Sequence, residues 1–110
     1  MKTLFEVETE PAAVDLPPLR GSELHRPWAT EIRARKLAAC EEFLRQWRLL
    51  IERYQDSGRD DAADREREGY REALDALSAL QTQQKSTWWI DRRQNEAHEL
   101  LLGAEPKPGR

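Results

Sequence analysis

The chain has a single cysteine, two histidines and five glycines among its 110 residues, and it contains no long hydrophobic run. One cysteine cannot form a disulfide within the chain, so a reducing compartment fits and we expect a cytoplasmic protein. No stretch approaches the roughly eighteen apolar residues of a membrane span. The N-terminus also lacks the basic and apolar regions of a signal peptide. We therefore expect no membrane partner.

An excess of positive charge is also missing. Lysine and arginine number 18 against 21 aspartate and glutamate residues, which gives a formal net charge of −3. This balance argues against a protein whose whole surface binds nucleic acid, although a local basic patch is compatible with it. With 38% hydrophobic and 35% charged residues, the composition is typical of long exposed helices that carry one apolar stripe each.

The strongest pattern that is present is an apolar stripe in the first half of the chain. Its residues follow one another at alternating spacings of three and four, and they are Leu37, Cys40, Leu44, Trp47, Ile51 and Tyr54. Side chains at this spacing lie on one side of an α-helix, and the average period of 3.5 keeps the stripe facing a partner helix. The stripe therefore predicts a helix–helix packing seam.

Two long helices are predicted around this seam. The first begins at Pro27, because proline suits the first helical position, and it ends near Asp56, before Gly58. The second begins at Asp60 or Asp61 and, with only Gly69 as an interruption, continues as one rod to about residue 102. A break at Ser86 and Thr87, which would cap a third helix, is the alternative. The short linker makes the two helices antiparallel.

The predicted fold class is all-α, an antiparallel helical hairpin with an extended N-terminal arm. Residues 1–25 form the arm because they hold three prolines, residues 26–102 form the hairpin domain, and residues 103–110 form a flexible tail. A structureless tail is the alternative for the arm.

Apolar residues beside the seam predict dimerisation into a helical bundle. Phe43 and Leu50 flank the seam, and the antiparallel register, which places Trp28 near Ile90, leaves residues 92–102 projecting past the first helix. Leu100, Leu101 and Leu102 would then be bare unless the arm or a second copy covered them. Four helices are the smallest stable arrangement of this kind, so we expect a homodimer.

The candidate partner-binding residues combine aromatic or apolar side chains with arginine, and they are Trp88, Trp89, Arg92, Arg93, Leu4, Phe5 and Val7. Tryptophan and arginine dominate the energetics of protein interfaces. Packing in the core is the alternative for the two tryptophans. Stacking on nucleic-acid bases is a further alternative, which the neighbouring acidic residues disfavour.

No catalytic, cofactor or metal site is predicted. Glu72 and Asp75 resemble half of the acidic motif of all-α nucleotide pyrophosphohydrolases, but the Glu-x-x-Glu partner upstream is missing. Asp91 and His98, seven residues apart, would lie about 10 Å apart along a helix, too far for a direct hydrogen bond. We therefore expect a non-enzymatic helical interaction protein, such as an adaptor, an assembly factor or a small subunit of a complex. A small all-α hydrolase remains an alternative.

Overall fold

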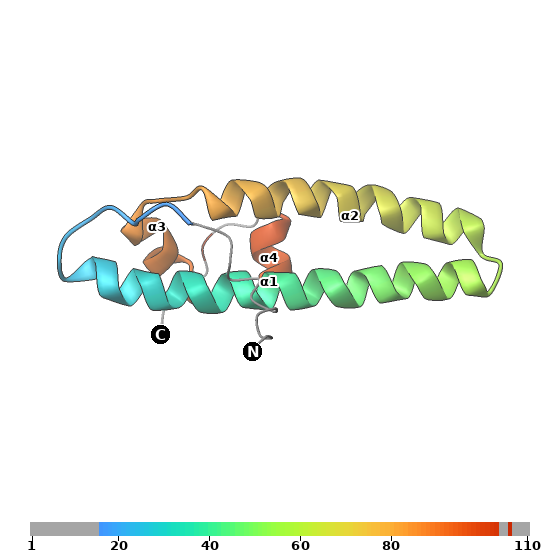
Figure 1. The fold of residues 1–110 in the computed structure, drawn as a ribbon, viewed down its shortest axis with the longest axis horizontal. Coiled ribbons are helices and arrows are strands. Elements are labelled where there is room, and N and C mark those ends of the chain that lie inside the picture. Colours follow the sequence, from blue (N-terminus) through green and yellow to red (C-terminus); the bar gives the residue numbers. More distant parts are fainter. Residues whose placement is uncertain (1–15, 104–105, 107–110) are drawn as a thin grey trace, which may run out of the picture.

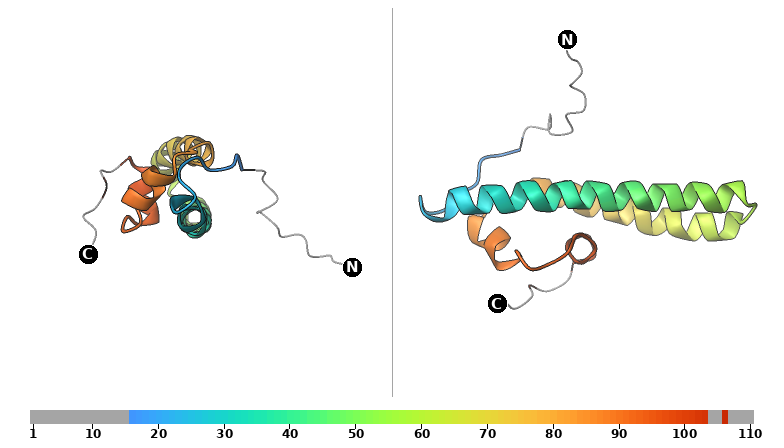
Figure 2. Two further views of the ribbon diagram at one scale, coloured as in Figure 1. Left: turned by 90° about the vertical axis from the view of Figure 1, so that its left-hand side faces the viewer. Right: turned by 90° about the horizontal axis from the view of Figure 1, so that it is seen from below.

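The computed structural model describes residues 16–103 and residue 106, and these residues form an all-α hairpin with short C-terminal helices. The elements are α1 (His25–Asp56), α2 (Asp60–Gln81), α3 (Ser86–Asp91) and α4 (Ala97–Leu101). Figure 1 shows α1 and α2 running side by side over most of their length. Figure 2 shows that α3 and α4 lie together on one side of this pair. The predicted all-α class and the helical hairpin are confirmed.

The bend of the hairpin lies where the sequence predicts it, between the end of the first helix before Gly58 and the start of the second helix at Asp60. Gly58 adopts a φ of 77°, the left-handed conformation that ends many helices and that glycine adopts without strain. Asp60 and Asp61 then place negative charge in the first turn of α2, where the helix dipole favours it. At its other end α1 begins two residues before Pro27, because the carbonyl of Ser22 accepts hydrogen bonds from the backbone N–H groups of His25 and Arg26.

The predicted seam is the surface along which α1 packs. Leu37, Cys40, Leu44 and Ile51 are buried, and Trp47 and Tyr54 are half-buried. Trp47 donates its indole N–H to Glu66 at 2.9 Å and packs edge-on against Tyr70. A Cβ at Gly69 would lie 3.0 Å from the Trp47 ring, which explains why a glycine stands inside α2, a helix that continues through it.

The prediction that the second helix continues to residue 102 is wrong. α2 ends at Gln81, and α3 begins at Ser86, where the alternative placed a third helix. Thr82 and Gln83 close the last turn of α2 by donating their N–H groups to the carbonyls of Ala79 and Leu80, and the chain beyond them bonds elsewhere. Arg20 donates its N–H to the carbonyl of Gln84 at 2.7 Å, and Ser86 donates its N–H to the carbonyl of Arg20 at 3.0 Å. Gln84 and Ser86 therefore pair with Arg20, in the segment before α1, and do not extend α2.

This break removes the expected overhang. The chain folds back along α1, and α4 buries Leu100 and Leu101, so that of the three leucines only Leu102 is exposed, at 69%. The existence of α4 was not predicted. Its signal in the sequence is the pair Glu96 and Glu99, whose side chains form a capping box at the N-terminus of the helix.

Part of the core lies between the first half of α1, the segment before it, and α3. Ile32, Leu19 and Trp89 are buried there, and Arg33 donates a hydrogen bond to the carbonyl of Pro17 at 2.7 Å. Residues 16–20 of the predicted arm are thus packed on the hairpin. Leu4, Phe5 and Val7 lie outside the described residues. Within residues 16–103, no helix is both long enough and apolar enough to cross a membrane.

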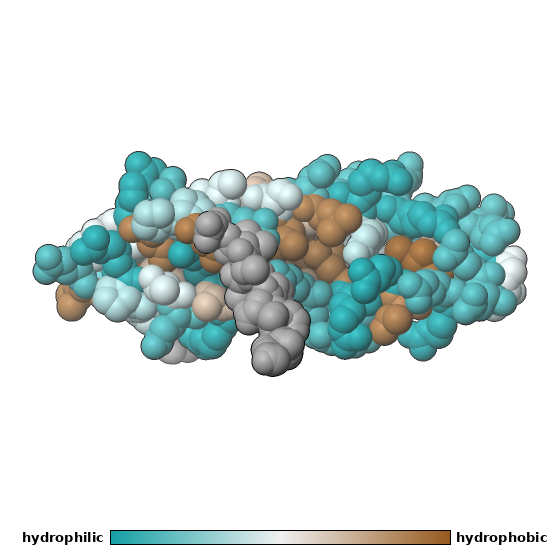
Figure 3. All heavy atoms as spheres, viewed as in Figure 1, coloured by the Kyte–Doolittle hydropathy of each residue, from teal (hydrophilic) through white to brown (hydrophobic). Residues whose placement is uncertain are grey.

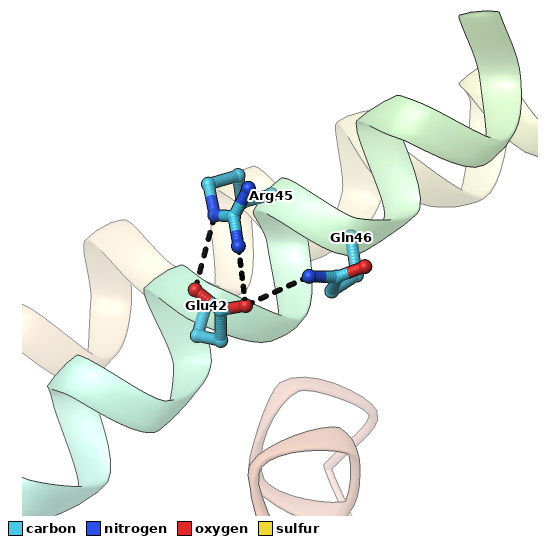
Figure 4. A network of polar contacts seen from close by, with 3 residues as sticks. All are labelled: Glu42, Arg45 and Gln46. Atoms are coloured by element: carbon cyan, nitrogen blue, oxygen red, sulfur yellow. Dashed lines mark hydrogen bonds and ion pairs between the residues drawn. The ribbon is translucent and has the colours of Figure 1, made fainter.

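The outward face of α1 carries a polar network that contributes little to packing. Arg45 and Gln46 both donate hydrogen bonds to the carboxylate of Glu42, as Figure 4 shows. The ion pair between Glu42 and Arg45 is exposed to solvent on both sides. Exposed ion pairs of this kind have only small effects on stability, since water and salt screen them.

The seam and this network predict opposite results for two neighbouring substitutions. Leu44→Ala removes a buried side chain and should lower the free energy of unfolding by about 2–5 kcal/mol. Glu42→Ala should change it little. Chemical denaturation followed by circular dichroism measures both, and equal losses would mean that α1 packs through a different face.

Candidate protein-binding surface

Two tryptophans and two arginines form a surface where α1 begins and α3 ends, and we call Trp28, Trp88, Arg92 and Arg93 the Trp–Arg surface. The guanidinium carbon of Arg92 lies 4.1 Å from the centre of the Trp88 ring. That of Arg93 lies 5.4 Å from the centre of the Trp28 ring. Both distances fall within the range of cation–π contacts. The two arginines therefore hold two aromatic side chains at the surface.

The arginines keep donors for a further ligand. One nitrogen of Arg93 donates to the carbonyl of Ile90 at 2.7 Å, and one nitrogen of Arg92 lies 3.4 Å from the carbonyl of Trp88. A guanidinium has five N–H donors, so these contacts use a minority of them. None of the ion pairs found within residues 16–103 includes either arginine. The surface is thus suited to a carboxylate brought by another segment.

Trp89 does not belong to this surface. Its side chain is 0% exposed, and its indole N–H donates to the carbonyl of Gln83 at 3.0 Å. The ring of Trp88 packs edge-on against it and remains half-buried. Neighbouring residues of a helix point about 100° apart, so one tryptophan enters the core and the other stays at its boundary. In this structure Trp89 is part of the hydrophobic core. Packing in the core was the alternative role that the sequence analysis gave for the two tryptophans.

Trp28 was not among the predicted partner-binding residues, yet it is 46% exposed and lies under Arg93. The signal was present in the hairpin register, which already placed Trp28 near Ile90. That register assumed a continuous second helix, however, and Arg93 lies beyond the end of α3, so the contact with Trp28 depends on the tertiary fold.

A second candidate surface is an apolar groove between α1, α2 and the end of α4. It has a volume of about 480 Å³ and is lined by Phe43, Gln46, Trp47, Leu50, Arg53, Glu66 and Leu102. We call this the hairpin groove. Hydrophobic side chains also gather in the furrow between α1 and α2 on the opposite face, away from α3 and α4 (Figures 2 and 3). The hairpin thus exposes apolar surface on both faces.

The residues considered for catalysis are not assembled into a site. Glu72, Asp75 and Asp91 are all exposed, and Asp91 and His98 lie on separate helices. Within the described part of the chain, no cluster of three His, Cys, Asp or Glu side chains is arranged to hold a metal ion. The geometry offers no pair of these groups positioned for acid–base chemistry.

Cys40 lies in the seam as a buried free thiol, with its sulfur 3.9 Å from the carbonyl of Ala97. Burial raises the pKa of this thiol from 9.0 to about 11. The nucleophilic form of cysteine is the thiolate, so at neutral pH this side chain is protonated and unreactive.

No family model, curated protein or solved structure matches this chain.

The raised pKa of Cys40 predicts a loss of stability in alkali. The unfolded thiol ionises near pH 9 and the folded thiol near pH 11, so the folded state binds more protons between these values. The free energy of unfolding should therefore fall as pH rises through this window, and Cys40→Ala should remove that component. Denaturant melts of both proteins at pH 8 and pH 10.5 measure it. Equal pH dependence in the two proteins would contradict the burial argument.

Proposed function

We propose that this chain is a non-enzymatic helical interaction protein, an adaptor, assembly factor or small subunit of a larger complex. Its partner is a protein that presents an acidic segment with apolar side chains. The observation that carries this proposal is the Trp–Arg surface. There Arg92 lies over Trp88 and Arg93 lies over Trp28, and most N–H donors of the two arginines are not used by the hydrogen bonds described above. Tryptophan and arginine are the residues that most often dominate binding energy at protein interfaces.

The charges at this end of the molecule support an acidic partner. Residues 20–36 contain five basic and two acidic residues. The bend at the other end is acidic, since residues 57–75 contain seven acidic and four basic residues. An acidic segment is therefore steered to the end that carries the Trp–Arg surface and away from the bend.

A nucleic-acid ligand is the less favoured alternative. Stacking a base requires a free aromatic face, but Arg92 already covers Trp88 at 4.1 Å and Arg93 lies over Trp28. The overall charge of −3 also repels a polyanion. Binding of mixed oligonucleotides that weakens steeply with salt would favour this alternative over the protein partner.

A hydrolase is disfavoured for a different reason. Glu72, Asp75 and Asp91 are exposed, and the hairpin groove is apolar and holds one carboxylate, that of Glu66. Glu66 already accepts the indole N–H of Trp47. The surroundings of these carboxylates therefore support binding over acid–base catalysis.

We also propose that the protein is a homodimer in the cytoplasm. The hairpin groove leaves Phe43 and Leu50 in contact with solvent, and a pair of helices alone buries little of their apolar surface. A buried free thiol at Cys40 suits a reducing compartment.

The test of the partner surface is the double variant Arg92→Ala with Arg93→Ala. It removes both guanidinium groups from the Trp–Arg surface, so it should abolish recovery of the native partner in affinity capture. The melting temperature should stay within a few degrees, because these side chains lie outside the hydrophobic core. The matched control is Arg48→Ala with Arg71→Ala, which removes two exposed arginines elsewhere on the hairpin. The control should retain the partner.

Two results would contradict the proposal. If the Arg92 and Arg93 variant captures the same partner as the unmodified protein, the surface is not the binding site. If the variant loses its helical structure, the two arginines stabilise the fold and the surface has no separate role.

A further inference from the structure

The short helices cover only one half of the hairpin. α4 lies beside the middle of α1, where Ala97 contacts the sulfur of Cys40 and the ring of His98 lies 6.2 Å from that of Phe43. Beyond Phe43, α1 continues for about 20 Å to its end at a rise of 1.5 Å per residue. Along this distal half, α2 is the only described helix that packs on α1. The hairpin groove opens here.

The groove has an apolar floor and two rims of opposite charge. Phe43, Trp47 and Leu50 form the floor, with Phe43 and Trp47 packed edge-on at 5.8 Å. Arg53 lines the groove from α1, and Glu66 lines it from α2. A surface that carries a cation on one helix and an anion on the other can be complementary to itself.

We infer that a second copy of this chain occupies the hairpin groove, related to the first by a two-fold axis that passes close to Leu50. This inference rests on the proposed homodimer and specifies its interface. Glu66 is level with Trp47, three residues before Leu50, because the two side chains are hydrogen-bonded. Arg53 is three residues after Leu50. A two-fold rotation about an axis at Leu50 brings the position three residues after Leu50 in one copy opposite the position three residues before it in the other. Arg53 of each copy therefore faces Glu66 of the other.

The same rotation avoids a collision between the short helices. α4 lies level with Cys40 and Phe43, about 10–15 Å before Leu50 along α1, and the bend begins about 10 Å after Leu50. The two-fold axis therefore places α4 of the second copy from the start of the bend of the first copy outward. The two uncovered distal halves meet as four antiparallel helices, the arrangement that buries apolar stripes of this kind. Leu102, which is 69% exposed in the single chain, is brought toward the distal half of the second copy.

Light scattering on the full chain across micromolar concentrations tests this interface with two adjacent leucines. Leu50→Asp places a charge in the groove and should convert a two-chain mass into a single-chain mass. Leu49 is 38% exposed and does not line the groove, so Leu49→Asp is the matched control and should keep the two-chain mass. Circular dichroism confirms that both variants stay helical.

A charge exchange tests the two-fold register. Arg53→Glu places a carboxylate opposite Glu66 at each of the two rims and should weaken the dimer about tenfold, because two attractive pairs become repulsive. Adding Glu66→Arg restores opposite charges only if these residues face each other across the axis. The double variant should therefore recover most of the affinity.

Cross-linking keeps the test decisive if Leu50→Asp fails to fold. Leu50→Cys should form a disulfide between copies under mild oxidation, because the axis brings this position close to its own equivalent, whereas Leu49→Cys should not. Native Cys40 is buried and adds no background. A single-chain mass for the unmodified protein would overturn both the homodimer and this interface. A two-chain mass that persists in Leu50→Asp, without a Leu50→Cys cross-link, would overturn the interface alone.

Discussion

Two backbone hydrogen bonds at Arg20 decide the shape of this molecule. They join Arg20 to Gln84 and Ser86 at 2.7 and 3.0 Å, and they draw the chain away from α2 toward the segment before α1. Gly21 follows with a φ of 146°, and a Cβ at this position would lie 3.0 Å from Ser86, so the close approach requires glycine. Because the chain turns here, α3 returns along α1 and Trp89 becomes buried.

The consequence is a hairpin with two unlike halves. In the first half, α3, α4 and the segment before α1 enclose a core around Trp89 and Ile32. In the distal half, α1 and α2 are the only helices of the described residues that pack on each other, and apolar side chains remain in a groove. The first half supplies stability and carries the Trp–Arg surface on its outside. The distal half presents the surface that a second copy would cover. Binding and dimerisation would then use separate ends, so a partner on Arg92 and Arg93 would not compete with the dimer.

The sequence predicts the parts of the fold that local chemistry determines. The seam from Leu37 to Tyr54, the bend at Gly58 and the start of α2 follow from periodicity, glycine and helix-dipole preferences, and all three are present. The cap-type residues Ser86 and Thr87 offered a break in α2 only as an alternative, because the hydrogen bonds that favour it join residues more than sixty positions apart. The same holds for Trp89, whose burial depends on where α3 returns. Of the candidate site, Trp88, Arg92 and Arg93 lie together at the surface as the sequence suggested, and Trp28 joins them through the tertiary fold.

The backbone pairing at Arg20 is tested most directly by amide hydrogen exchange of its N–H group, followed by nuclear magnetic resonance. This N–H donates to the carbonyl of Gln84, so it should exchange slowly, at a rate close to that of core amides in α1 such as Ile32. If the chain instead continued α2 as one rod, Arg20 would precede the first helix without a partner for its N–H. Exchange of this amide at the rate of an unprotected peptide would contradict the account.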